Sequence, residues 1–185
     1  LAPFLRGASE PCVFPIPFGV QVMADARRSS DEARNSNTKA DVAERLGTVL
    51  ASTYALRIKT QNFHWNITGP NFIALHTLLE THYKELDEAI DVVAERIRAL
   101  DAVAPGSFAA FAEMSHIKDA PAEPPREKVM IETLVSDHVA VSELCTELST
   151  FADDAEDHAT ADIMNGRIEA HDKAAWMLRS HLANG

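Results

Sequence analysis

The chain has 185 residues, of which 46% are apolar and 24% are charged, as expected for one folded domain with a substantial core. Its net charge of −11 favours cationic partners over the phosphate backbone of nucleic acids. The sequence has no apolar run near the ~20 residues of a membrane-spanning helix, and its two distant cysteines, Cys12 and Cys145, argue against a disulfide framework or a thiolate zinc site.

Residues 1–38 are predicted to form a tail outside the folded domain. Residues 24–38 are polar, with almost nothing to bury, and this composition predicts disorder. Met23 follows the apolar run "CVFPIPFGVQV", so we expect residues 1–22 to be an upstream extension; a signal peptide is the alternative, which the prolines disfavour. Four arginines balance four carboxylates in residues 1–38, whereas a tail that binds DNA carries a clear positive charge.

From Asp41 onward, apolar residues recur every three, four or seven positions, which is typical of helices with one buried face. The first helix is expected at about 41–65, ended by "NITGPN", and the second at about 72–100, with Asn71 as its cap. "FAAFAEM" predicts a short helix, the third long helix starts near Pro125, and the fourth spans about 157–182.

This order of elements predicts an all-α fold. Four long helices, with a short extra helix in the long connection between the second and the third, describe a ferritin-like four-helix bundle. No strand pattern appears in the sequence. We therefore expect a single ferritin-like domain over residues 39–185.

The second helix carries two pairs of metal-binding side chains on one face. His76 and Glu80 are one turn apart, and so are Asp91 and Glu95, so each pair can present two ligands to one metal ion. On a helical wheel the four residues fall within about 100° of one another. Roughly 22 Å of helix separates the pairs, whereas metal–ligand bonds are about 2 Å long. The two pairs therefore cannot share a metal ion within one chain.

Two chains solve this separation. If the second helix packs antiparallel against its own copy across a two-fold axis near its middle, His76 and Glu80 of one subunit face Asp91 and Glu95 of the other. His64, near the end of the first helix, is the natural additional ligand. Imidazole and carboxylate ligands together suit Fe(II), with Zn(II) or Mn(II) as competitors. The alternative is that the acids form a solvated helix face and that the histidines are incidental.

The stretch "QNFHWNITGPNFIALHTLLE", followed by "YKELDEAIDVVAERI", resembles the Dps family, the miniferritin DNA-protection proteins of starved bacteria. The family's His-Trp-Asn, Leu-His and Asp-x-x-x-Glu-Arg elements stand here with ungapped spacing. The ending "HDKAAWMLRSHL" is similar to the last helix of the family, so the resemblance covers about residues 41–182.

The resemblance implies a ferroxidase site formed by His64, His76 and Glu80 of one subunit and by Asp91 and Glu95 of its two-fold partner. It also implies that Fe(II) is oxidised, preferably by hydrogen peroxide, and is stored as ferric mineral inside a hollow dodecameric shell, with iron and no haem. Coupling the two-electron reduction of peroxide to iron oxidation avoids hydroxyl radicals and so limits oxidative stress.

Three further residues receive roles from the same resemblance. Trp65 follows His64 and is similar to the family tryptophan beside the site, where it either donates electrons or packs between helices. Asp157 and Asp162 belong to an acidic cluster at the place where family members line their iron-entry pores, and such a cluster steers cations. The alternative for Asp157 is to cap the fourth helix.

The other histidines receive no ligand role. His82 lies away from the stripe and is expected to pack or to face solvent, and His138 is expected to be structural. No partner spacing supports a site for the rest, among them His158, His171 and His181. The element "EMSH" matches the Glu-x-x-His of di-iron bundles, but it occurs only once, and we interpret it as chance.

Three functions remain in competition. The first is a homo-oligomeric ferroxidase and iron-storage shell, placed in a reducing cytoplasm by the cysteine usage. The second is a nucleoid-associated, DNA-binding protein whose iron chemistry is secondary, which the charge balance of the tail disfavours. The third is a di-iron oxidase or an inert bundle that forms no shell; the lack of paired Glu-x-x-His elements and the stripe on the second helix argue against it.

Overall fold

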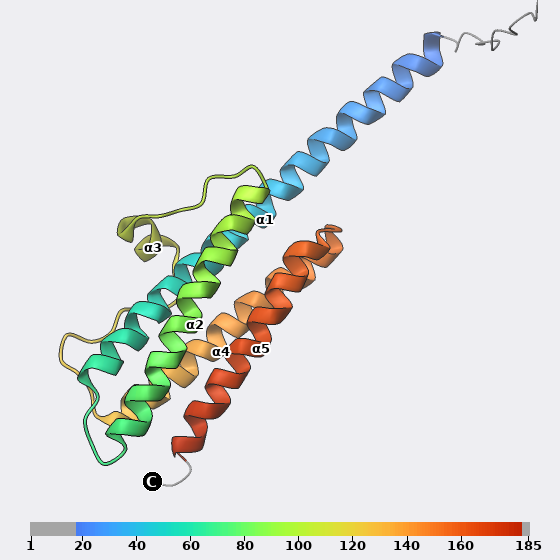
Figure 1. The fold of residues 1–185 in the computed structure, drawn as a ribbon. Helices are drawn as coiled ribbons and strands as arrows, with labels where there is room; N and C mark the ends of the chain where they lie inside the picture. Colours follow the sequence, from blue (N-terminus) through green and yellow to red (C-terminus); the bar gives the residue numbers. More distant parts are fainter. Residues whose placement is uncertain (1–17, 183–185) are drawn as a thin grey trace, which may run out of the picture. The chain divides into compact units, whose positions relative to one another are not determined.

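The computed structural model describes the backbone of residues 18–182 and the side chains of residues 38–182. Its elements, shown in Figure 1, are α1 (Phe18–Asn66), α2 (Phe72–Ala99), α3 (Phe108–Met114), α4 (Glu127–Asp154) and α5 (His158–Leu182). No strand occurs between residues 18 and 182. The predicted order of four long helices, with a short one between the second and the third, is therefore confirmed.

The first helix begins earlier than expected. α1 starts at Phe18, whereas the sequence pattern places its start near Asp41, after a disordered segment at 24–38. Residues 20–46 contain no glycine or proline, so nothing there breaks a helix. Continuing an existing helix also avoids the cost of a new nucleus, so a polar composition alone does not end it. Residues 1–17, which include most of the expected extension, lie outside the described residues.

The chain divides into two units, residues 1–37 and residues 38–185. In the second unit, the long helices enclose one hydrophobic core. Phe72, at the start of α2, is 38% exposed, and its ring lies against His76 with the ring centroids 5.0 Å apart. The largest fully buried side chains are those of Leu46, Leu50, Leu56, Phe63, Ile67, Leu75, Leu79, Leu86, Ile97, Met130, Ile131 and Leu134.

Ion pairs join neighbouring helices around this core. Lys59 of α1 is almost fully buried, and its Nζ lies 2.6 Å from Oδ2 of Asp137 on α4. Burial raises the pKa of Asp137, although the hydrogen bond from Lys59 acts in the opposite direction. Arg57 of α1 holds Asp87 of α2 through two nitrogens, at 2.6 and 3.0 Å. These pairs fix α1 against both α2 and α4.

The turn between α1 and α2 is tied to the start of α4. Gly69 has φ +130°, where a side chain is strained, and an added Cβ would lie only 2.5 Å from Oε2 of Glu127. Asn71 occupies the predicted N-cap position of α2, but its side chain makes no capping bond. Its Nδ2 donates instead to Oε1 of Glu127, at 2.8 Å. The turn is therefore held by α4 as well as by its own backbone.

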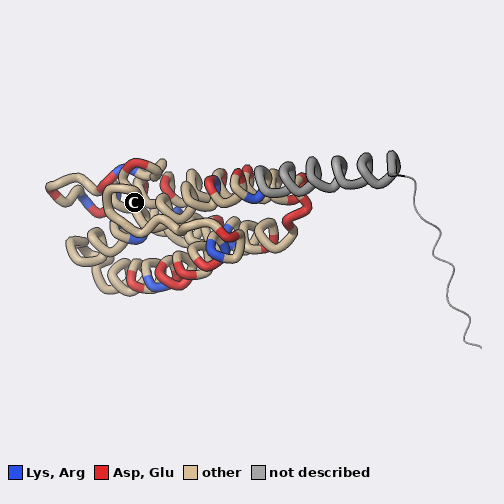
Figure 2. The backbone as a smooth tube through the Cα atoms, turned by 90° about the horizontal axis from the view of Figure 1, so that it is seen from above, with Lys and Arg blue, Asp and Glu red and all other residues tan. Residues whose placement is uncertain are grey.

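Acidic residues outnumber basic ones in the second unit, in line with the net charge of −11. Figure 2 shows acidic positions on several helices of the second unit, with fewer basic ones among them. Within residues 18–182, no helix combines the length and the apolar character needed to cross a bilayer.

Cys145 lies in the core on α4 and carries a free thiol. Burial raises its pKa to about 12, against a smaller lowering by the charge of Arg167. The thiol therefore stays protonated at neutral pH, as expected for a cysteine that serves packing rather than metal binding.

Candidate metal centre

The end of α1 and the start of α2 bring two predicted ligands together. The imidazole rings of His64 and His76 stack, with centroids 3.8 Å apart and planes inclined by 23°. His64 is only 7% exposed, and His76 is half-buried. The contact forms because the tight turn after Asn66 folds the start of α2 back along the last turns of α1.

Two reciprocal hydrogen bonds fix the tautomer of both rings. Nδ1 of His64 lies 2.8 Å from the carbonyl oxygen of His76, and Nδ1 of His76 lies 2.9 Å from the carbonyl oxygen of His64. Because a carbonyl oxygen only accepts hydrogen bonds, each Nδ1 carries a proton and donates it. In the neutral ring the lone pair then lies on Nε2. Both histidines therefore offer Nε2 to a metal ion, in rings oriented by the backbone.

Glu80 lies one turn after His76 and is half-buried. Its Oε1 accepts a hydrogen bond from Nζ of Lys84, at 2.5 Å. That bond, with the charge of Lys84, lowers the pKa of Glu80, and His64 and His76 act in the same direction. The carboxylate is thus ionised at neutral pH, but it is turned toward Lys84 in the single chain.

Asp91 and Glu95 lie at the other end of the same uninterrupted helix, and both are exposed. Neither side chain makes a hydrogen bond or an ion pair to another described residue. Among residues 38–182, no three histidine, cysteine or acidic side chains gather in an arrangement that holds a metal ion. One chain therefore brings His64 and His76 together, and it leaves Asp91 and Glu95 apart from them.

Two aromatic side chains flank His64. The ring of Tyr83 meets it edge-on, with centroids 5.3 Å apart. Trp65, the neighbour of His64 in sequence, is 65% exposed, so it does not pack between helices of its own chain. Packing between helices of one chain is therefore not observed, and electron donation stays a prediction.

Comparison with known proteins places the chain in a family. The model of the ferritin-like domain matches residues 43–185. A DNA protection during starvation protein of Agrobacterium fabrum is 33% identical over 147 residues, which cover 80% of this chain and 91% of the relative. The chain belongs to the Dps family of ferritin-like proteins. The predicted family and bundle fold are therefore confirmed.

Solved Dps structures agree with this assignment. A Dps protein from Bacillus brevis is similar with a TM-score of 0.76 and 33% identity, over 79% of this chain and 97% of that chain. A Dps protein from Vibrio cholerae has a TM-score of 0.76 and 27% identity, over 80% and 92% of the two chains. That protein is described as a member of a broad superfamily of ferritin-like diiron-carboxylate proteins.

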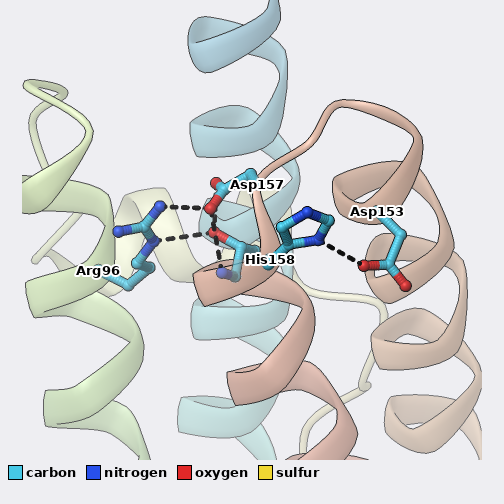
Figure 3. Close-up of polar contacts among 5 residues, drawn as sticks. Arg96, Asp153, Asp157 and His158 are labelled. Atoms are coloured by element: carbon cyan, nitrogen blue, oxygen red, sulfur yellow. Dashed lines mark hydrogen bonds and ion pairs between the residues drawn. The ribbon is translucent and has the colours of Figure 1, made fainter.

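In the acidic cluster between α4 and α5, Asp153 and Asp157 are hydrogen-bonded to neighbouring side chains, as Figure 3 shows. Asp157 accepts a hydrogen bond from Arg96 at 2.6 Å and caps α5 through the backbone N–H and the hydroxyl of Thr160, at 3.1 and 2.6 Å. Burial acts to raise the pKa of Asp157, but these bonds outweigh it and lower the pKa. The capping alternative for Asp157 is therefore realised. Asp162 is exposed, and its role in a pore stays a prediction.

Three histidines lie together inside the Dps bundle, a grouping that the sequence analysis did not predict, although packing was one expected role of His82 and a structural role was expected for His138. His82 on α2, His138 on α4 and His171 on α5 are all buried, and they lie ring against ring as an inner histidine cluster. The available signal was their position: each stands three, four or seven residues from a buried apolar residue of its own helix, so each lies on the core face. His158 instead lies at the surface, beside Asp153.

Proposed function

We propose that this protein oxidises Fe(II) at sites shared between two subunits and stores the ferric product inside a homo-oligomeric shell. The observation that carries the proposal is the His64–His76 pair, in which backbone carbonyls hold both Nδ1 protons and leave both Nε2 lone pairs free for a cation. The ferritin-like family assignment and the diiron-carboxylate description of the similar Vibrio cholerae protein support iron as that cation.

The remaining ligands come from a second copy of the chain. Asp91 and Glu95 are exposed and unpaired among the described residues, roughly 22 Å along α2 from His76 and Glu80. An antiparallel pair of α2 helices, related by a two-fold axis near the middle of the helix, places each acidic pair opposite the histidine pair of its partner. Each dimer then holds two identical sites, and each site draws on both subunits.

The chemistry follows from the ligand types. Ionised Glu80, Asp91 and Glu95 supply negative charge for Fe(II), and the two neutral imidazoles leave coordination positions open to an oxidant. With hydrogen peroxide as the oxidant, two Fe(II) ions lose one electron each, and one peroxide takes up both electrons and two protons to give two water molecules. We assign to Trp65, the neighbour of His64 in sequence, the role of supplying an electron when only one Fe(II) ion is bound.

The shell is expected to be a dodecamer in the cytoplasm, as the family resemblance implies. Protection of DNA, the activity in the name of the Agrobacterium relative, then follows from removing Fe(II) and peroxide together. A nucleoid protein that binds DNA directly is the second candidate. The net charge of −11 opposes it, because binding to DNA depends on neutralising phosphates with Lys and Arg.

The decisive experiment is complementation between two variants. His76→Ala and Asp91→Ala are each expected to assemble and to lose fast Fe(II) oxidation when peroxide is added under anaerobic conditions. In a dimer of one His76→Ala and one Asp91→Ala subunit, one site carries both changes and the other carries neither. Random co-assembly should therefore restore about a quarter of the parental sites.

The control is Glu132→Ala, which removes an exposed carboxylate from α4 and should leave oxidation unchanged. Shell size is recorded for every sample. If the two single variants oxidise iron at the parental rate, the ligand assignment is wrong. If both are inactive and mixing restores nothing, the ligands do not come from two subunits in the proposed way.

A further inference from the structure

Apolar side chains form an accessible stripe on α1, beside the His64–His76 pair. Tyr54, Ile58 and Trp65 fall within about 40° of one another on a helical wheel. Ile58 is 40% exposed, Trp65 is 65% exposed, and Tyr54 is half-buried. Tryptophan is highly buried in most folded proteins, because its large ring system gains much from leaving water. The stripe therefore indicates a contact that one chain does not supply.

α3 extends this apolar surface. Six of the seven residues of Phe108–Met114 are apolar, yet none of them is buried, and Phe108 is 75% exposed. The ring of Phe111 stacks on Tyr54 with centroids 4.5 Å apart, and the ring of Phe108 meets Tyr54 edge-on at 6.5 Å. So short a helix is not stable by itself in water, and the apolar side chains of a helix normally face a core. α3 thus presents an aromatic face that nothing in its own chain covers.

Two contacts show which part of α2 lies beside each part of α1. Nδ1 of His64 lies 2.8 Å from the carbonyl oxygen of His76, and Arg57 holds Asp87 at 2.6 Å. The two helices are therefore antiparallel, and positions nearer the start of α1 lie beside positions nearer the end of α2. Trp65, which follows His64, belongs to the histidine end of this pair of helices.

α3 lies at the other end, beside the acidic half of α2. Tyr54, on which both phenyl rings of α3 rest, is level with the turn of α2 that contains Asp91. Gly47 lies two turns nearer the start of α1, level with Glu95. A Cβ added to Gly47 would lie 2.7 Å from Cε of Met114, so the last residue of α3 packs there. α3 therefore flanks the two acidic residues that the proposed iron site takes from the partner subunit.

The proposed dimer brings the two ends together. Its two-fold axis passes near the middle of α2 and places Asp91 and Glu95 of one subunit opposite His76 and Glu80 of the other. The aromatic face of α3, which flanks the acidic pair, then comes opposite Trp65, which flanks the histidine pair. By symmetry, each dimer contains this contact twice.

We propose that the aromatic face of α3, formed by Phe108 and Phe111 with Tyr54, packs on Trp65 of the partner subunit and covers the shared iron site from solvent. The inference rests on the two-fold arrangement of the proposed function and adds to it residues that bind no metal ion. Excluding water beside His64 strengthens the attraction between the carboxylates and Fe(II). The buried aromatic rings also stabilise the dimer, because such rings dominate the binding energy of interfaces.

The fluorescence of Trp65 tests the contact. The chain has two tryptophans, so Trp176→Phe leaves Trp65 as the only one. In the assembled Trp176→Phe protein, Trp65 should emit at a shorter wavelength than tryptophan in water. Acrylamide should quench it about threefold less than it quenches N-acetyltryptophanamide, because the core of an interface excludes water. Adding Phe108→Ser should lengthen the emission wavelength and increase the quenching. Adding Val139→Ser, which changes a 37% exposed residue of α4, is the matched control and should change neither.

Chemical cross-linking shows which subunit covers Trp65. Chains with Phe108→Cys and chains with Trp65→Cys are co-assembled, each with Cys12→Ser, so that buried Cys145 is the only other cysteine. A short bismaleimide should then give a covalent dimer on a denaturing gel. Either variant assembled alone is the control and should stay monomeric on that gel, because the two copies of each position lie at opposite ends of the proposed dimer.

The results separate this inference from the iron chemistry, because neither measurement uses iron. Strong quenching of Trp65 in the assembled Trp176→Phe protein, or the absence of a cross-link, would overturn the inference, even if mixing His76→Ala and Asp91→Ala subunits restores oxidation. A cross-link together with parental oxidation rates in both of those variants would support the contact and reject the ligand assignment. If Phe108→Ser prevents assembly, the emission of Trp65 and the cross-link still decide.

Discussion

The His64–His76 pair and the inner histidine cluster use the same side chain in opposite ways. In the first, carbonyl oxygens accept from Nδ1 and leave lone pairs on Nε2. In the second, Arg167 donates to Nε2 of His171, whose Nδ1–H donates to His138 and leaves the proton of His138 on Nε2. The hydrogen-bond partner behind the ring thus decides whether a histidine binds a cation or donates a proton. Residue type alone does not.

The largest expected effect separates the two groups by activity. His76→Gln removes an Nε2 lone pair from the proposed iron site and should slow peroxide-driven Fe(II) oxidation by about 100-fold or more, in the upper range for metal-site residues. His138→Gln keeps a side-chain N–H donor in the core and should change the rate by less than about twofold. Stopped-flow absorbance of the ferric product measures both rates. An equal loss of oxidation rate in the two variants would contradict the different roles assigned to His76 and His138.

The next effect concerns stability at low pH. The pKa values of His82 and His138 in the folded protein, about 4 and about 3, lie below the ordinary 6.5, so the unfolded chain binds more protons in between. Their contribution to stability is complete above about pH 6.5 and is lost as the pH falls toward 4, by roughly 1 kcal/mol or less per pH unit for each histidine.

Thermal unfolding at fixed protein concentration, followed at pH 7 and pH 5, measures this loss. His82→Phe should reduce the difference between the two midpoints, because a phenyl ring takes up no proton. His158→Phe, which changes an exposed histidine, should leave the difference as it is in the parent. A His82→Phe protein with the full parental pH dependence would contradict the assigned burial effect.

The smallest expected effect concerns the ion pair between Lys84 and Glu80, beside the His64–His76 pair. Lys84 holds the carboxylate of Glu80 in the single chain, so Lys84→Met should free it for the cation. Because the pair is exposed, we expect only a twofold to fivefold gain in Fe(II) affinity, about the range of surface ion pairs, and a smaller gain at high salt. Anaerobic Fe(II) titration measures it, with Lys128→Met, which changes an exposed lysine on α4, as the control. Weaker binding after Lys84→Met would mean that Lys84 supports the site.

Much of this molecule is predictable from the sequence, because amphipathic periodicity determines which helix face is buried. The bounds of α2, α3 and α5 agree with the predicted ones to within about two residues, the usual uncertainty of helix ends. The start of α1 was missed because polar composition does not stop a helix that lacks glycine and proline. Asn71 was expected to cap α2, but its side chain is bound by Glu127, a residue far away in sequence.

The candidate sites were predictable to different degrees. His76, Glu80, Asp91 and Glu95 lie on one helix, so their spacing places them on one face without knowledge of the rest of the fold. The inner cluster draws on α2, α4 and α5, and its contacts depend on how these helices pack. The tautomers depend in addition on single hydrogen bonds, which no sequence pattern encodes.

The burial of Cys145 has a consequence for the proposed peroxide chemistry. Peroxide attacks the thiolate form of cysteine and converts it to sulfenic acid and then to irreversible products. Because burial raises its pKa to about 12, this thiol stays protonated at pH 7. The sulfur in the middle of α4 is therefore protected from the oxidant of the proposed reaction, and repeated turnover in that reaction should leave the packing around it chemically intact.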